Sequence, residues 1–209
     1  MGMSQLWRAV PQIDLQYRKV EKVTDSKKKD FYISVDVETA GPTPGDYSLL
    51  SIGACTVLEP PNTFYVELKP ENENALSEAL AISRLSIPKL MKSGLEPVQA
   101  MTQFKDWLEQ VVPSGHRPVF LAFNAPFDWM FINDYFYRYL GYNPFGHAAL
   151  DIKAFYMGLT GVAWNETSMQ HVTQRYFGER QLTHHALRDA LDQSELFLKM
   201  LAEAASTNR

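Results

Sequence analysis

The chain has 209 residues, of which 45% are hydrophobic and 21% are charged, and its formal net charge is -4. This length and composition indicate one globular domain and exclude fibrous and low-complexity proteins. No apolar stretch approaches the ~20 residues of a membrane span, and Cys55 is the single cysteine, so an internal disulfide is excluded too. We therefore expect a cytoplasmic protein that has no membrane contact, with Cys55 as a buried small residue.

Residues 1–30 are expected to form an extended or flexible arm before a folded domain that spans 31–209. The end of this arm, from Glu21 to Asp30, contains few apolar residues and several lysines, namely Lys22, Lys27, Lys28 and Lys29. A solvated run of charge explains the pattern, and a basic arm that touches a nucleic-acid backbone is the functional alternative.

The folded part begins with three expected strands, at 31–38, 48–58 and 63–68. They are apolar runs rich in β-branched and aromatic residues, and turn residues such as those from Gly41 to Gly45 separate them. Their short connections predict an antiparallel meander of three strands.

Helical and strand patterns alternate along the rest of the chain. We expect, in order, a helix over 98–112, a strand at 118–123, an aromatic-rich helix over 127–140, a strand at 148–150 before another helix, and closing helices over 167–177 and 186–204. This order predicts an α/β domain in which a mixed sheet, the meander plus parallel strands, is flanked by helices.

Three groups of polar residues interrupt this apolar pattern. Asp36 and Glu38 point to one side of their strand, where two adjacent carboxylates repel each other and favour a bound cation. Asp128 stands at the start of an apolar helix, where it could simply cap that helix. His184 precedes Asp189 at the start of the last helix, and a surface pairing would explain that group alone. Together, the three groups indicate a functional site more strongly than any one of them does alone.

In type, order and spacing, these groups resemble the DEDDh branch of the DnaQ-like 3′-5′ exonucleases, over about residues 31–205. The motifs are Asp36-x-Glu38, Asn124-x-x-x-Asp128 and His184-x-x-x-x-Asp189. The resemblance implies a ribonuclease H-like fold and an enzyme that releases nucleoside 5′-monophosphates from the 3′ ends of single-stranded DNA or RNA.

The resemblance also assigns roles to these residues. It implies that the acids bind two divalent ions, and ligands that are oxygen only suit Mg²⁺ or Mn²⁺; the four are Asp36, Glu38, Asp128 and Asp189. It implies that His184 is the general base, because the family spacing of four residues to Asp189 selects His184 over His185. We interpret His185 as a neighbouring polar contact.

Within the superfamily, the segment from Asp36 to Gly41 looks most like ribonuclease T and the polymerase proofreading subunits. Ribonuclease T works as a dimer, which makes a homodimer one expected assembly. The resemblance places the terminal nucleotide against the backbone of Thr39 and Ala40 and the side chain of Leu49 or Leu50.

Two further residues have two interpretations each. Phe127 could stack on a base or pack in the core, with the core favoured. Asn124 could contact a phosphate or sugar, or it could fix the turn before Asp128.

Two other classes of protein remain as alternatives. Glycoside hydrolases also use paired acids, but that chemistry would leave two acids and His184 without a role. A non-catalytic nucleic-acid-binding module with an exonuclease fold is the second alternative, although no metal ligand is missing here.

Overall fold

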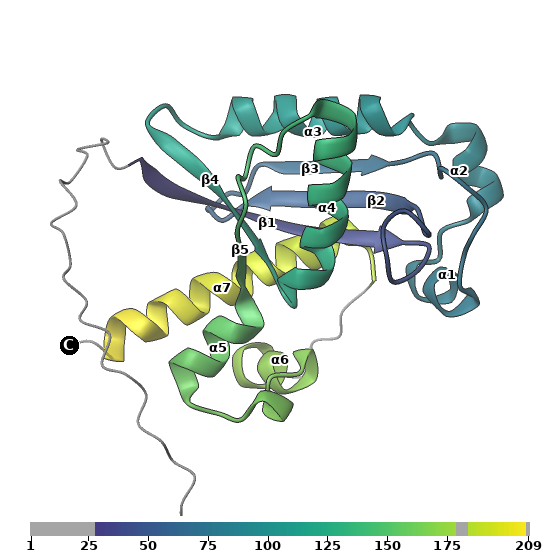
Figure 1. Ribbon diagram of the computed structural model, residues 1–209. Coiled ribbons are helices and arrows are strands. Elements are labelled where there is room, and N and C mark those ends of the chain that lie inside the picture. The colour runs from purple at the N-terminus through teal and green to yellow at the C-terminus, as the bar shows by residue number, and fades with distance from the viewer. Residues whose placement is uncertain (1–27, 179–183, 208–209) are drawn as a thin grey trace, which may run out of the picture.

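A computed structural model describes residues 28–178 and 184–207 (Figure 1). The predicted arm therefore lies outside the described residues, except for its last three positions from Lys28 to Asp30.

A five-stranded mixed sheet with the order β3-β2-β1-β4-β5 forms the centre of the protein. The strands are β1 (Lys29–Thr39), β2 (Leu49–Thr56), β3 (Thr63–Glu67), β4 (His116–Ala122) and β5 (Ala149–Asp151). The first three pair antiparallel, while β4 joins β1 and β5 joins β4 in parallel. The predicted meander with added parallel strands is confirmed, and β1 begins earlier than predicted because Lys29 already pairs with His116.

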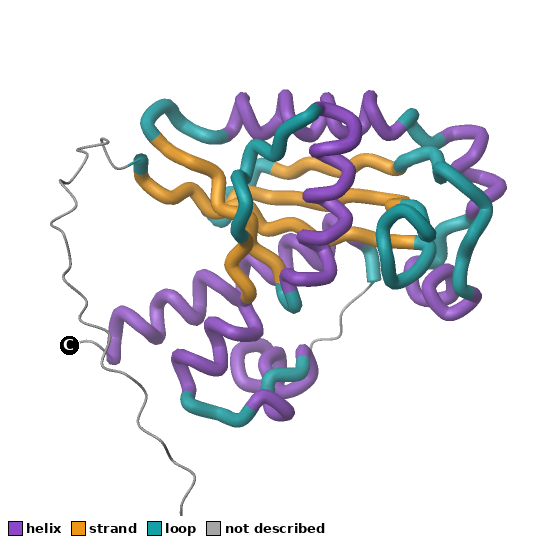
Figure 2. Tube along the Cα trace, viewed as in Figure 1, coloured by secondary structure: helices purple, strands orange, loops and turns teal. Residues whose placement is uncertain are grey.

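Helices cover both faces of this sheet (Figure 2). They are α1 (Ser77–Ser83), α2 (Ile87–Ser93), α3 (Pro97–Val111), α4 (Ala125–Leu140), α5 (Ile152–Thr160), the 3₁₀ turn η1 (Trp164–Glu166), α6 (Met169–Phe177) and α7 (Ala186–Thr207). Helix α7 packs on β1 and β2, and α3 and α4 pack together on the opposite face. No helix within the described ranges is long and apolar enough to cross a membrane.

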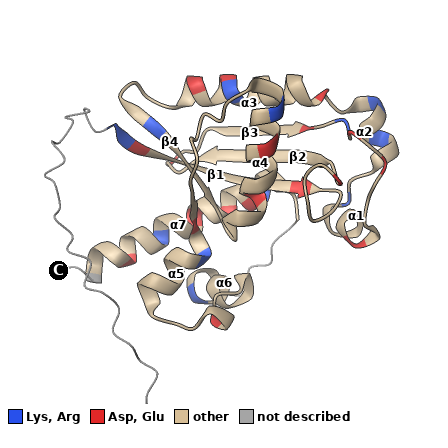
Figure 3. Cartoon of the chain, viewed as in Figure 1, with Lys and Arg blue, Asp and Glu red and all other residues tan. Residues whose placement is uncertain are grey.

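The side chains of β1 divide between the two faces. Ile33, Val35 and Val37 belong to the apolar core beneath α3 and α4. Because successive side chains of a strand point to opposite faces, Asp36 and Glu38 face α7. The polar end of β1 therefore lies under the start of α7, where Asp and Glu residues gather in Figure 3.

A single glycine determines how closely α7 approaches the sheet. A Cβ atom on Gly53 would lie 2.1 Å from the backbone carbon of Ala186 and the backbone nitrogen of Leu187, so only glycine fits there. The side chains of Ser34 and Cys55 both donate to the carbonyl oxygen of Ala190, at 2.8 and 3.4 Å. These contacts fix the first turns of α7 on β1 and β2.

Cys55 is fully buried in this contact, as the sequence predicts. Burial raises the pKa of its thiol to about 12, so the side chain stays protonated and unreactive.

Candidate active site

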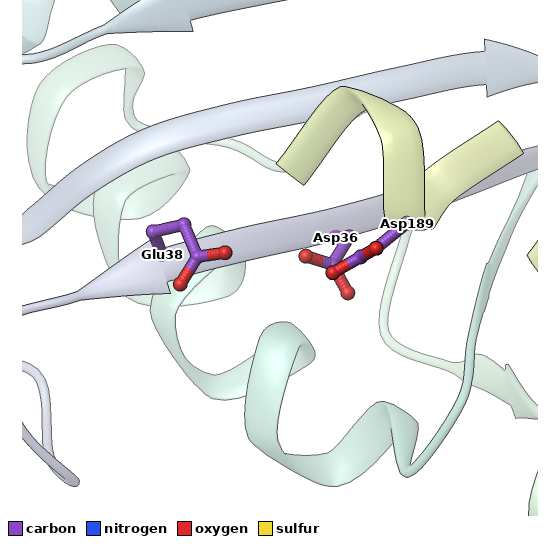
Figure 4. A group of neighbouring side chains, drawn as sticks. All are labelled: Asp36, Glu38 and Asp189. Atoms are coloured by element: carbon purple, nitrogen blue, oxygen red, sulfur yellow. The ribbon is translucent and has the colours of Figure 1, made fainter. Parts of the chain in front are cut away.

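Three carboxylates from two elements meet at the carboxyl end of β1. Asp36 and Glu38 project from the strand, and Asp189 reaches the same place from the first turn of α7 (Figure 4). An oxygen of each carboxylate lies within 4.8 Å of the others. The structure thus brings together three of the four acids that the sequence motifs single out.

Asp128, the fourth acid, reaches the end of β1 from α4. It is buried in the first turn of that helix, and its Oδ1 accepts a hydrogen bond of 3.0 Å from the backbone N–H of Val37. The ladder between β1 and β4 ends at Ser34 and Leu121, so Asp128 takes the place of a strand neighbour beside Val37. It therefore ties α4 to β1 and also lines the cleft that the other acids share.

Burial and mutual repulsion oppose ionisation of these acids. Burial raises the pKa of Asp36 well above its ordinary value, and the charges of the neighbouring acids raise it further. Burial, followed by the charge of Asp189, raises the pKa of Glu38 to about 7. Burial also raises the pKa of Asp128, while the hydrogen bond from Val37 acts in the opposite direction. A cation among them would relieve this repulsion.

The donor set itself fits a hard divalent cation. All of its atoms are carboxylate oxygens, which suit Mg²⁺ or Mn²⁺ better than softer metals. The close approach of Asp36, Glu38 and Asp189 would be costly as bare charges and becomes favourable around such an ion.

His184 lines the same cleft, which has a volume of about 200 Å³. The cleft is bounded by Asp36, Val37, Glu38, Phe123, Asn124, Phe127, Asp128, Met169, His184, Asp189 and Gln193. The backbone of His184 is left-handed, with φ of 52°, and α7 begins two residues later. His185 does not line the cleft, because its ring stacks on Tyr65 with 4.8 Å between centroids. The structure thus places His184 among the acids and turns His185 toward β3.

Of the four residues expected to meet the terminal nucleotide, two lie at or directly after the end of β1 and two at the start of β2. Thr39 and Ala40 are buried directly after Glu38, and the hydroxyl of Thr39 donates to the carbonyl oxygen of Gly41. Leu49 and Leu50 are wholly buried in the core, so neither side chain has a surface that could meet a nucleotide. We therefore leave both leucines out of the substrate contacts.

Asn124 and Phe127 both reach the cleft. Asn124 is left-handed, with φ of 63°, directly before α4. Its N–H donates to Asp151 Oδ1 at 2.9 Å, which holds the turn. Phe127 lines the cleft and packs against Phe131. The position of each residue therefore agrees with both interpretations, a contact with substrate and a structural role.

Gln193 is a member of the site that the motifs did not single out. Its Nε2 donates to Asp36 Oδ1 at 2.7 Å, and its Oε1 accepts from the N–H of Phe123 at 3.1 Å. Gln193 lies one helical turn after Asp189 and so on the same face of α7, which is a signal that the sequence does contain. Its amide links a carboxylate of the acidic group on β1 to the end of β4.

The hydrogen bond from Gln193 to Asp36 leads to a prediction about metal binding. Replacing Gln193 by alanine leaves Asp36 unrestrained, and loss of such an outer contact weakens metal affinity by about 10- to 100-fold. Titration calorimetry with Mn²⁺ measures the change. The exposed Gln103→Ala on α3 is the matched control and should bind Mn²⁺ as the unaltered protein does. Equal affinity in both variants would contradict a role for Gln193.

The raised pKa of Glu38 leads to a prediction about the metal-free protein. Between its ordinary pKa of 4.5 and its raised value of about 7, the folded protein keeps a proton that the unfolded chain has released. Rising pH therefore favours unfolding across this window, and stability falls. Melting temperatures in EDTA should decrease from pH 4.5 toward pH 7, and Glu38→Gln should flatten the decrease. A melting temperature that rises with pH in EDTA would show that Glu38 is ionised in the metal-free fold.

Solved structures share this fold. The nuclease domain of 3′hExo, described as a DEDDh family member bound to rAMP, has a TM-score of 0.71 at 13% identity, covering 84% of this chain and 93% of that one. Exonuclease I of E. coli in complex with a dT13 oligonucleotide has a TM-score of 0.62 at 18% identity, covering 84% of this chain and 41% of that one. These likenesses show the fold, and the oxygen-only acidic group beside it fits a divalent cation.

Relatives in sequence show the family to which the chain belongs. No family profile matches the chain. It is 49% identical over 169 residues to the 3′-5′ DNA exonuclease Cap18 of Escherichia coli, covering 81% of this chain and 90% of the relative. It is 29% identical over 185 residues to ribonuclease T of Vibrio parahaemolyticus, covering 80% of this chain and 83% of that relative. The chain belongs to the DnaQ-like 3′-5′ exonuclease family, as its motifs predict.

Proposed function

We propose that this protein removes nucleotides one at a time from the 3′ end of single-stranded DNA and releases nucleoside 5′-monophosphates. The observation that carries the proposal is the group of Asp36, Glu38 and Asp189, which shares one cleft with His184. The choice of DNA is supported by the relative named a DNA exonuclease, at 49% identity, against 29% for ribonuclease T.

The acids would hold two cations, Mg²⁺ or Mn²⁺. Asp36, Glu38 and Asp189 would hold them together with Asp128, which lines the same cleft. When bound, the cations supply charge stabilisation at the phosphorus and make a water molecule more acidic. Gln193 holds the carboxylate of Asp36 in place before any cation arrives.

His184 acts as the general base. An imidazole nitrogen takes a proton from the attacking water, whose oxygen forms the new bond to phosphorus. The bond from phosphorus to the 3′ oxygen of the preceding nucleotide breaks, and that oxygen takes up a proton. Histidine suits this task because imidazole exchanges protons near neutral pH.

Residues at the rim of the cleft would hold the terminal nucleotide. Phe127 would stack on its base and Asn124 would meet its sugar or phosphate, since both residues line the cleft. The backbone of Thr39 and Ala40, directly after Glu38, would bound the same nucleotide.

The proposal is tested with 5′-labelled single-stranded DNA and RNA of matched sequence, with Mg²⁺, Mn²⁺ or EDTA. We expect a ladder that shortens from the 3′ end of DNA, with slower loss of RNA and no product in EDTA. Faster degradation of RNA would overturn the choice of DNA. Binding without cleavage by metal-loaded protein would instead identify a non-catalytic nucleic-acid-binding module. The predicted homodimer and cytoplasmic location stay predictions.

A further inference from the structure

The stacked rings of His185 and Tyr65 join the start of α7 to β3. Their centroids lie 4.8 Å apart and their planes differ by 23°. The hydroxyl of Tyr65 donates to Glu67 Oε1 at 3.2 Å, which sets the direction of its ring. Tyr65 lies opposite Gly53 in the sheet, and Gly53 lies opposite Asp36. The stack is therefore separated from a carboxylate of the acidic group by one residue without a side chain.

The backbone of His185 connects this stack to the site. Its carbonyl oxygen accepts the N–H of Asp189 at 2.9 Å, which closes the first turn of α7. His184, the residue before it, has a φ of 52°, a left-handed conformation that is unfavourable for a side chain of this kind. Such a conformation persists only where its surroundings enforce it. The stack holds the residue that directly follows His184 and is therefore one contact that can enforce this conformation.

The electrostatics agree with a short path from Tyr65 to the acids. Burial raises the pKa of Tyr65 to about 12, the charge and the hydrogen bond of Glu67 add to the effect, and Glu38 contributes as well. Tyr65 therefore stays neutral and keeps the proton that it donates to Glu67.

We propose that His185 and Tyr65 are positioning residues, and that their stack holds His184 in the cleft where it can act on the attacking water. This inference rests on the proposed role of His184 as general base. Neither ring of the stack lines the cleft. Loss of the stack leaves the acids on β1 in place and releases only the residue that carries the base.

The test compares variants that keep or lose the stacked rings. In His185→Ala, the turnover number kcat should fall by about 10- to 100-fold, because small misplacement of a catalytic group has effects of this size. KM and the affinity for Mn²⁺ should stay within about twofold. His185→Phe and Tyr65→Phe keep both rings and should retain kcat within about threefold. Tyr65→Leu repeats the loss of stacking from the other partner if His185→Ala does not fold.

A double variant shows whether the stack acts through His184. If it does, then adding His185→Ala to His184→Ala should slow the reaction no further. Multiplied effects in the double variant would overturn the proposal, as would a rise in KM at constant kcat, which would identify a base-stacking surface. Inactive His185→Phe would overturn it too, because the imidazole itself would then be required. Full activity of His184→Ala alone would refute the general base of the proposed mechanism rather than the stacking contact.

Discussion

Asp36→Asn will reduce the exonuclease rate by about 10³-fold or more, equivalent to about 4 kcal/mol of barrier. Burial and the charges of the other three acids all raise the pKa of Asp36, and its carboxylate would be a central ligand of the cations. Asparagine has the same shape but only one oxygen and no charge, so it would hold a divalent cation far less well. Single-turnover hydrolysis of 5′-labelled DNA measures the loss, and calorimetry with Mn²⁺ should show weaker binding.

The matched control for this variant is Asp30→Asn on the same strand. Asp30 pairs with Arg117 at 2.6 Å at the far end of β1, and its replacement should leave the rate unchanged. The melting temperature measured in EDTA shows whether the variant folds. Asp36→Asn removes repulsion among buried acids, so the metal-free variant should be at least as stable as the unaltered protein. If Asp36→Asn cleaved DNA at the full rate, Asp36 would be excluded as a required metal ligand.

His184→Ala will lower kcat by about 10²- to 10⁴-fold, the range that general acid–base catalysis contributes. His184 is exposed and contributes no carboxylate oxygen to the acidic group, so Mn²⁺ affinity should be retained. Added imidazole should restore part of the rate, because a free base can enter the space that the side chain leaves.

His147→Ala is the control for this substitution. His147 is also exposed but lies before β5, in a hollow with Lys28 and Arg117 at the other end of the sheet. The control should cleave DNA normally. If His184→Ala lost metal affinity and rate in equal measure, the histidine would be a ligand rather than the base.

Alternation along a strand made much of the site predictable. Asp36 and Glu38 share a face because they are two residues apart. The resemblance to the exonuclease family, with four residues between His and Asp, selects His184, which lines the cleft, over His185, which stacks on Tyr65. The mixed sheet could be predicted because its strands are apolar runs bounded by clear turn residues.

Contacts between distant segments could not be predicted in this way. Helices α1 and α2 are only seven residues each, and their apolar residues pack beside Ala40 and Leu50 rather than repeating over several turns. The hydrogen bond from Val37 to Asp128 depends on where β4 stops pairing with β1, which no local pattern specifies. For the same reason, the sequence did not reveal that the fold buries the side chains of Leu49 and Leu50 completely.

Because α7 packs directly on Gly53, the acidic group is complete only after this helix has been synthesised and has docked on the sheet. Asp36, Glu38 and Asp128 are synthesised well before His184 and Asp189, which join them only when α7 docks on β1 and β2. A chain that ends before His184 therefore carries part of the acidic group and has neither the proposed base nor Asp189. We expect such a chain to lack nuclease activity.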